Sequence, residues 1–272
     1  MLVREKNRPT IHDYLPRIFE EFFELHGDRG YGDDGAILGG IARLNGVPVT
    51  IIAEVKGRNL EENKRSNFAM PHPEGYRKAL RLAKQAEKFH RPIICFIDTP
   101  GAFCGVEAEE RGQGEAIAKN LAEFMSLKTP VVSVVLGEGG SGGALALGVC
   151  DDLAMLENAL YSVISPRGAA SILWKDAARE REACEIMRIT AQDLLEFGVA
   201  DAIIPEPEDG AQGDLDKMSQ NIKEYLVKTI AVKSKKDIDI LQKERYTKFR
   251  KIGVFSEPSH EVQKAAAGNE NE

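Results

Sequence analysis

Two glycine-rich segments hold the residue types whose spacing points to chemistry. In the first, residues 98–105, Pro100 follows Asp98 and Thr99 and precedes two glycines, Gly101 and Gly105. The second has five glycines in the seven positions 137–143. Glycine lacks a Cβ, so backbone N–H groups in such segments approach a ligand closely, at an entropic cost that needs a structural reason. The candidate substrate-binding residues in these segments are Gly101, Ala102, Phe103, Gly139, Gly140, Ser141 and Gly142.

The second segment matches the dinucleotide-binding pattern G-x-G-x-x-G. Gly137, Gly139 and Gly142 supply the glycines, and Glu157 lies twenty residues beyond the first of them. That pattern belongs to a βαβ unit of roughly 30 residues. Here the following helix is expected to span only residues 142–149, and two crossovers precede the motif. These features argue against a dinucleotide site.

The same segment matches the nucleophile elbow G-x-S-x-G through Gly139, Ser141 and Gly143. That mechanism needs an acid and a histidine later in the chain, and the only histidine after Ser141 is His260, in a polar tail. An oxyanion hole needs no side-chain base, and none is evident. The amides of Gly143 and Ala144 would donate to a developing negative oxygen, each worth about 3 kcal/mol of barrier. This third interpretation is favoured.

Basic and metal-binding residues give weaker signals. Lys56 and Arg58 follow an apolar run next to a glycine, and a contact with a ligand, a contact with a partner and simple solvation all stay open for them. The four cysteines form no C-x-x-C pair, and their spacing fits neither a zinc site nor a redox dithiol. We therefore expect no metal site in this chain.

The elements that position the glycine-rich segments follow from apolar runs and turn residues. Runs 36–44 and 47–55 flank Asn45-Gly46, which predicts a hairpin. From residue 74 onward helical and apolar extended segments alternate, which predicts an α/β fold with a parallel sheet covered by helices. Both glycine-rich segments would follow the carboxyl ends of strands, where ligands bind in such sheets. Helices are expected at 13–27, 74–90, 112–125, 142–149, 169–174, 176–187 and 191–197, with two more in 214–251, strands at 92–98, 130–136, 153–156, 161–164 and 198–205, and loops at 56–73 and 137–143.

Composition restricts the partners. The formal net charge of −7 gives no general attraction to nucleic acid or anionic membranes. No segment reaches the roughly 18 apolar residues of a membrane span, and the first ten residues lack the apolar stretch of a signal peptide. A cytoplasmic protein is therefore expected. Residues 255–272 are polar and are expected to be disordered.

Several long blocks make the chain resemble the carboxyltransferase α subunits of multisubunit bacterial acetyl-CoA carboxylases. The resemblance runs from about Arg8 to Tyr246. The blocks that carry it are residues 39–44, 73–79, 96–102, 109–113, 137–145, 162–166 and 170–175.

The resemblance implies a crotonase-like fold of β-β-α units, formed by residues 1–254 as a single domain with N- and C-terminal helices. It implies transfer of the carboxyl group of carboxybiotin, held on a separate biotin carboxyl carrier protein, to acetyl-CoA. The product would be malonyl-CoA, in the first committed step of fatty acid biosynthesis. The site would be shared with a zinc-carrying β subunit in an α2β2 assembly, with Gly143 and Ala144 on the urea oxygen.

The chain also departs from the family pattern. Barely a dozen residues precede the first expected helix, whereas many members have a longer N-terminal arm, and Arg167 replaces the usual acidic residue. The chain has neither a Met-Lys-Met biotinylation signal nor the ATP-binding glycine loop of a biotin carboxylase, so both functions are expected on separate chains. Two alternatives stay open. One is a self-contained crotonase-type acyl-CoA hydratase or isomerase, which normally has a carboxylate base in its pocket, and the other is a non-catalytic scaffold subunit.

Overall fold

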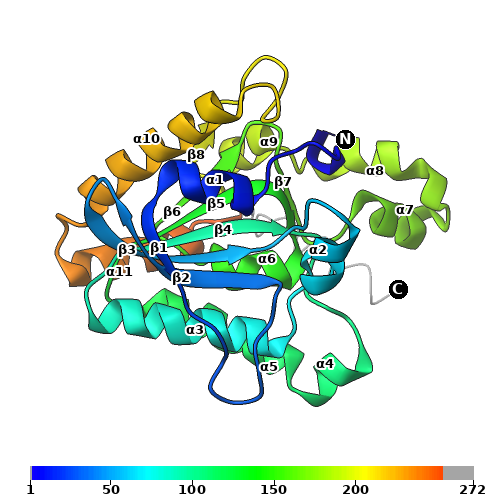
Figure 1. Cartoon of the computed structure of the whole chain (residues 1–272). Helices are drawn as coiled ribbons and strands as arrows, with labels where there is room; N and C mark the ends of the chain where they lie inside the picture. The colour runs from blue at the N-terminus through cyan, green and yellow to red at the C-terminus, as the bar shows by residue number, and fades with distance from the viewer. Residues whose placement is uncertain (1, 254–272) are drawn as a thin grey trace, which may run out of the picture.

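One mixed sheet organises the part of the chain that the computed structural model describes, residues 2–253. Its eight strands follow the order β1-β2-β3-β4-β5-β6-β8, with β7 beside the end of β5 (Figure 1). Strands β1, β2 and β3 pair antiparallel, and the later pairs are parallel, as the alternating pattern predicts. The strands are β1 Glu20–Glu24, β2 Ile37–Leu44, β3 Val47–Glu54, β4 Ile93–Thr99, β5 Val131–Gly140, β6 Asp152–Leu156, β7 Leu160–Ser162 and β8 Ala202–Ile204.

The predicted hairpin is confirmed. β2 and β3 pair in register around Asn45 and Gly46, which have φ angles of 48° and 77°. Two successive positive φ values characterise the tight turn whose twist matches that of the flanking strands, and asparagine followed by glycine adopts it at low cost. The hairpin supplies the antiparallel end of an otherwise parallel sheet.

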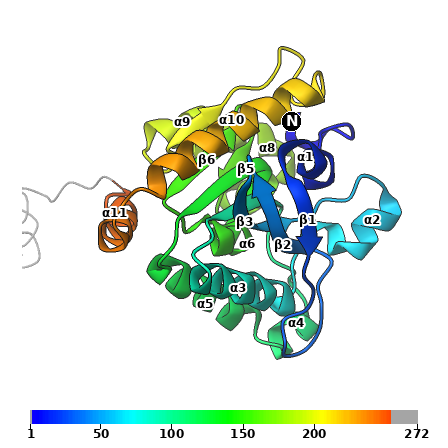
Figure 2. The same ribbon diagram turned by 60° about the vertical axis from the view of Figure 1, so that its left-hand side comes forward.

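Helices cover both faces of the sheet. α3 and α6 contact one face, with α5 packed against both of them, and α10 contacts the other face, with α1 packed against it (Figures 1 and 2). β4 is buried along its whole length between these layers. The helices are α1 Ile11–Ile18, α2 Leu60–Arg65, α3 Pro73–Lys88, α4 Val106–Glu110, α5 Gln113–Ser126, α6 Ser141–Gly148, α7 Pro166–Trp174, α8 Glu180–Met187, α9 Ala191–Glu196, α10 Leu215–Lys233 and α11 Ile238–Arg250, with the short 3-10 helices η1 Leu2–Arg4, η2 Asn67–Ala69 and η3 Ala177–Arg179.

The predicted helix over residues 13–27 is wrong beyond residue 18. The backbone becomes extended at Phe19, and residues 20–24 form the edge strand β1. The ring of Phe22 and the carbonyl of Phe23 occupy the space beside Gly40, where a Cβ would otherwise stand. Aromatic residues whose spacing suits a helix therefore lie in a strand, because pairing with β2 outweighs the local helical pattern.

Two predicted loops also contain regular structure. In residues 56–73, Asn59 caps the short helix α2 by accepting a hydrogen bond from the amide of Glu62 at 2.9 Å. In residues 137–143, β5 continues to Gly140 because it pairs there with β4 and β7, and α6 begins at the next residue. The second glycine-rich segment is therefore a strand end joined directly to a helix.

The C-terminal helices agree with the sequence pattern, with one difference. The predicted helix 176–187 is divided into η3 and α8, whereas α10 and α11 occupy the predicted charged segment. The predicted disordered tail, residues 255–272, lies outside the described residues. Among residues 2–253, no helix combines the length and apolar character needed to cross a bilayer.

The connection between β1 and β2 is expected to make stability depend on pH in the acid range. Asp28 accepts hydrogen bonds from Arg77 and from three backbone amides, and Asp33 accepts one from Lys78. Burial alone would raise the pKa of each aspartate, but these donors lower both pKa values to about 2. An unfolded aspartate titrates near 3.9, so the unfolded chain binds protons first as the pH falls.

The stabilisation by Asp28 and Asp33 should therefore be complete at neutral pH and disappear between about pH 4 and pH 2. Urea unfolding followed by circular dichroism, at neutral pH and at several lower values, measures this. Asp28→Asn should be less stable than the wild type at neutral pH, and the difference should shrink on acidification. A difference that stays constant down to pH 2 would contradict the assignment.

Candidate active site

The parallel ends of β4 and β5 bring the two glycine-rich segments into contact. The strands pair as far as Gly139. A Cβ on Gly140 would lie 2.2 Å from the carbonyl oxygen of Pro100, and one on Gly143 would lie 2.5 Å from the amide nitrogen of Ala102. Neither position has room for a side chain. Glycine at these two positions therefore allows the segment after β4 to lie directly on the start of α6.

The first turn of α6 can stabilise negative charge. In a helix the first amides have no helical partner, which here applies to Ser141, Gly142 and Gly143, and the helix dipole adds partial positive charge. Ser141 has a φ of 53° and is exposed, whereas Gly143 and Ala144 are buried. Ala144 is the fourth helical residue, where the carbonyl of Gly140 is the regular partner of its amide.

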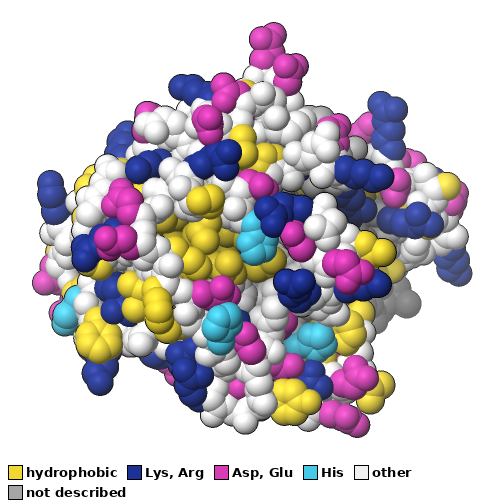
Figure 3. Space-filling model, viewed as in Figure 1, with side chains coloured by type: hydrophobic (Ala, Val, Ile, Leu, Met, Phe, Trp, Pro, Cys, Tyr) yellow, Lys and Arg dark blue, Asp and Glu magenta, His cyan; other side chains and the backbone are white. Residues whose placement is uncertain are grey.

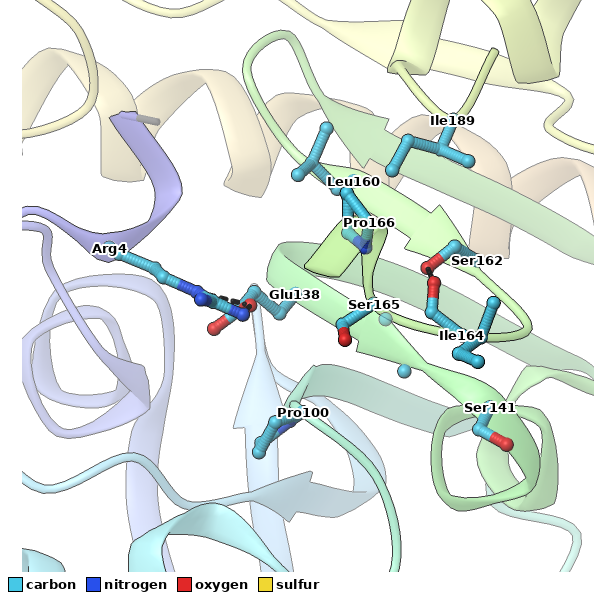
Figure 4. Close-up of a pocket in the computed structure, with 12 residues that line it drawn as sticks. Arg4, Pro100, Glu138, Ser141, Leu160, Ser162, Ile164, Ser165, Pro166 and Ile189 are labelled. Atoms are coloured by element: carbon cyan, nitrogen blue, oxygen red, sulfur yellow. Dashed lines mark hydrogen bonds and ion pairs between the residues drawn. The ribbon is translucent and has the colours of Figure 1, made fainter. Parts of the chain in front are cut away.

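A cavity opens beside this turn (Figure 4). Its volume is about 50 Å³, and it joins polar groups from Ser162 and Ser165 to apolar walls. Of the predicted site residues, Gly139, Gly140 and Ser141 line it, whereas Gly142, Gly143, Ala144 and the 101–103 segment lie beside or behind these. The lining residues are Arg4, Pro100, Glu138, Gly139, Gly140, Ser141, Leu160, Ser162, Ile164, Ser165, Pro166 and Ile189.

The cavity has two charged residues that the sequence does not predict. Figure 4 shows Arg4 reaching from the N-terminal turn to Glu138, and their side chains pair at 2.7 Å. Lys56 pairs with the other oxygen of Glu138 at 3.3 Å. Because two cations balance the charge of Glu138, this carboxylate differs from the free base of a self-contained hydratase. Among the polar lining residues that were not predicted, Ser165 had a sequence signal. Ser-Pro at the start of a helix marks an N-cap residue followed by the first helical residue.

The predicted basic residues lie in a second hollow, of about 550 Å³, that shares Arg4 with the cavity. Lys56 also lies 3.6 Å from Asp98, and Arg58 pairs with Glu62 at 2.8 Å. Each of these two cations therefore has a carboxylate partner. On the face in Figure 3, Lys and Arg alternate with Asp and Glu around a central apolar area, so no broad surface of one sign faces this side.

The third predicted residue of the first segment, Phe103, is fixed from both sides. Its amide donates to the carbonyl of Pro71 at 3.0 Å, and its ring stacks on His72 with the ring centres 4.4 Å apart. The side-chain amide of Gln113 donates to the carbonyls of both Pro71 and Phe103 at 2.9 Å. Phe103 thus anchors the far end of the segment that packs on α6.

Several buried ionisable groups lie behind the segment, and burial raises the pKa of each of them. Burial raises the pKa of Asp98, and Lys56 partly opposes this. Burial also raises the pKa of Glu54 and of Tyr76 well above their usual values. Among residues 2–253, no group of three or more His, Cys, Asp or Glu side chains is arranged to hold a metal ion. The polar groups that line the cavity are backbone amides, the serine side chains and the guanidinium of Arg4, which already donates to Glu138.

Residues 1–253 match the family model described as acetyl co-enzyme A carboxylase carboxyltransferase-like. The chain belongs to this family, as an α subunit. It is 58% identical over 256 residues to the carboxyl transferase subunit α of Clostridium acetobutylicum, covering 94% of this chain and 93% of that one. The α subunit of Shouchella clausii is 59% identical, with 94% of this chain and 79% of that chain covered. In Clostridium tetani a relative named subunits beta/alpha is 58% identical, and the match covers 44% of its length.

Solved structures agree on the fold. The 12S transcarboxylase has a TM-score of 0.63 at 21% identity, covering 83% of this chain and 44% of that chain. A Pseudomonas malonate decarboxylase hetero-tetramer chain has a TM-score of 0.63 at 17% identity, covering 79% of this chain and 86% of that one. At these identities the likeness concerns architecture, and it confirms the predicted crotonase-like carboxyltransferase fold.

Proposed function

We propose that this α subunit forms one half of a site where a carboxyl group passes from carboxybiotin to acetyl-CoA, giving malonyl-CoA. Membership of the family supports the reaction class. The observation that carries the proposal is the cavity beside the first turn of α6, where amides and hydroxyls are the donors besides Arg4, whose guanidinium pairs with Glu138. Such donors stabilise a negative oxygen without taking part in covalent chemistry.

The lining of the cavity suits contact with the ureido ring of biotin. Amides from the start of α6 suit the urea oxygen, while Leu160, Ile164 and Ile189 offer apolar contact to the ring. We propose that the predicted amides of Gly143 and Ala144 hold this oxygen together with the free amides of Ser141 and Gly142. Each free donor contributes about 3 kcal/mol, and Ala144, whose amide has the carbonyl of Gly140 as its regular partner, contributes less. Carboxybiotin, when bound, supplies the carboxyl group. The chain's own residues orient it and stabilise the charge that develops on the urea oxygen.

The other predicted residues are proposed to shape this site. Gly101, Ala102 and Phe103 form the wall that packs on α6, and Gly139, Gly140, Ser141 and Gly142 form its floor. Lys56 and Arg58 are proposed to line the approach to the cavity, where Glu138 and Glu62 partly neutralise their charges. Residues 1–254 would act together as a single domain in the cytoplasm.

The rest of the site is proposed to come from a β subunit. A hollow of about 50 Å³ is far smaller than the roughly 300–1,000 Å³ pockets that enclose whole ligands. This chain would therefore provide one wall, and a β subunit carrying zinc would hold acetyl-CoA opposite it. The fused beta/alpha relatives support such a partnership. An α2β2 assembly would then receive carboxybiotin on a carrier protein, made with ATP by a separate biotin carboxylase.

The test is malonyl-CoA formation from acetyl-CoA and carboxybiotin with this chain alone, with β alone and with both. Activity is expected only in the mixture, because each chain holds part of the site. Size-exclusion chromatography with light scattering checks the assembly in parallel. Activity in this chain alone would favour the self-contained hydratase type of site, and an inactive mixture with intact assembly would favour a scaffold.

A further inference from the structure

The hydroxyl of Thr99 joins three backbone groups next to the candidate active site. Thr99 is the last residue of β4 and is fully buried. Its Oγ1 lies 2.5 Å from the carbonyl oxygen of Ala69 and 2.9 Å from that of Gly101, and it accepts a hydrogen bond from the amide of Gly101 at 3.0 Å. A single side chain thus connects the turn before α3 to the segment that packs on α6.

A hydroxyl has one proton, so it cannot donate fully to both carbonyls. The shorter distance assigns the donated bond to Ala69, while the lone pairs receive the amide of Gly101. Thr99 therefore acts as a relay between two backbone segments. The Ala69 carbonyl is buried and the Gly101 amide is half-buried, so an unmet donor or acceptor there destabilises the arrangement.

The turn that Thr99 contacts has a strained backbone. Asn67, Phe68 and Ala69 have φ values of 50°, 55° and 60°, a left-handed run without glycine. L-residues avoid this region, and such runs persist where surrounding contacts fix them, often near functional sites. The bond from Thr99 to the Ala69 carbonyl is one of those contacts. The amide side chain of Asn67, which donates to the carbonyl of Met70 at 2.8 Å, is another.

On its other side Thr99 sets the position of the residues that touch α6. Gly101 has a φ of 146°, and the amide nitrogen of Ala102 comes next along the chain. That nitrogen and the carbonyl carbon of Gly101 lie 2.5 and 2.8 Å from where a Cβ of Gly143 would stand. With so little space, a shift of the 101–102 segment changes the position of the first turn of α6.

We infer that Thr99 is a positioning residue: its hydroxyl fixes the Gly101–Ala102 segment against Gly143 and so sets the geometry of the α6 amides. This inference rests on the proposed function for its effect on catalysis. It does not require Thr99 to touch substrate. The residue acts through the backbone groups that it holds.

The test compares Thr99→Val with Thr99→Ser and with Thr129→Val, in the assembled α/β enzyme. Thr129 is a matched control, because its buried hydroxyl donates to the carbonyl of Arg91 at 2.9 Å, away from the cavity. Thr99→Val should lower kcat about 10–100-fold, as expected for a displacement near 1 Å, with the KM for acetyl-CoA nearly unchanged. Thr99→Ser should retain most of the kcat, and Thr129→Val should leave kcat unchanged while losing similar thermal stability.

Hydrogen exchange measured by mass spectrometry provides a readout independent of activity. In Thr99→Val, exchange should accelerate in peptides covering residues 100–103 and the start of α6, and in Thr129→Val it should not. If Thr99→Val does not fold, Thr99→Ala replaces it, since alanine removes the hydroxyl without placing a methyl group against the Ala69 carbonyl.

The outcomes separate the two proposals. An inactive wild-type mixture with the expected exchange pattern would overturn the proposed function and keep the structural role of Thr99. An active wild type with equal kcat and equal exchange in Thr99→Val and Thr129→Val would overturn the inference. Failure of Thr99→Ser to restore kcat would overturn it too, because the hydroxyl would then not be the group responsible.

Discussion

Replacing Gly143 with alanine is expected to lower the kcat of carboxyl transfer about 10²–10³-fold, because it displaces the α6 amides and the loss of one oxyanion donor typically has an effect of this size. The added Cβ would lie 2.5 Å from the amide nitrogen of Ala102, 2.8 Å from the carbonyl carbon of Gly101 and 2.9 Å from the hydroxyl of Tyr76. Two of these atoms belong to the backbone, and Tyr76 is fully buried. The first turn of α6 and the facing segment would therefore have to separate. Steady-state kinetics of the assembled enzyme measures the loss.

The matched control is Gly114→Ala in α5. A Cβ there meets no atom within 4 Å, and the position is exposed. Exchanging glycine for alanine in a helix should raise the free energy of unfolding by up to about 1 kcal/mol and leave kcat unchanged. Gly143→Ala, in contrast, should also lose about 1–3 kcal/mol of stability through overpacking. Kinetics are therefore measured well below its melting temperature, with β binding checked by size-exclusion chromatography. If Gly143→Ala folds, binds β and has the kcat of the wild type, the proposed role of the α6 amides is wrong.

Much of the fold could be predicted because its signals are local. Buried parallel strands such as β4 and β5 appear as uninterrupted apolar runs, and α3 and α5 have apolar residues at helical spacing. Asn45 and Gly46 indicate their turn without reference to the rest of the chain. Where a short sequence determines the conformation, sequence and structure agree.

The errors in the predicted fold arise where a distant segment decides the conformation. Residues 19–23 have aromatic spacing that suits a helix, but the free edge of β2 and the space beside Gly40 favour a strand. Gly139 and Gly140 have the composition of a loop. They continue β5 because they pair with Tyr161 and Ser162 of β7, each 22 positions later. The spacing of apolar residues within a short stretch of sequence contains no information about the strand, β2 or β7, that pairs with it.

The candidate site divides in the same way. Glycine-rich segments can be recognised because glycine has a conformational meaning wherever it stands, so the residues around Gly101 and Gly143 are found from sequence. Arg4 and Glu138 are separated by 134 positions, and only folding brings their side chains to 2.7 Å. Thr99 is likewise inconspicuous in sequence. Its importance rests on two carbonyls and an amide that only the structure places around its hydroxyl.

Replacing Arg245 with methionine is expected to lower the free energy of unfolding by about 3–5 kcal/mol, because it leaves a buried carboxylate without its partner. The guanidinium of Arg245 is fully buried in α11 and pairs with both oxygens of Asp151, at 2.7 and 2.8 Å. It also donates to four carbonyls at the end of α5 and in the connection to β5, those of Phe124, Met125, Leu127 and Thr129. Urea unfolding monitored by circular dichroism gives the difference.

Arg181→Met is the control for that measurement. Arg181 is 94% exposed and lies 3.6 Å from Glu185 on the same helix, so its loss should change the free energy of unfolding by less than about 1 kcal/mol. The difference between the two losses in free energy of unfolding tests whether the contacts of α11 contribute to the stability of the core. Asp151 also accepts a hydrogen bond from the amide of Val131, the first residue of β5, at 2.7 Å. Arg245 therefore supports the start of the strand whose far end forms the floor of the cavity, and equal losses in the two variants would disprove that support.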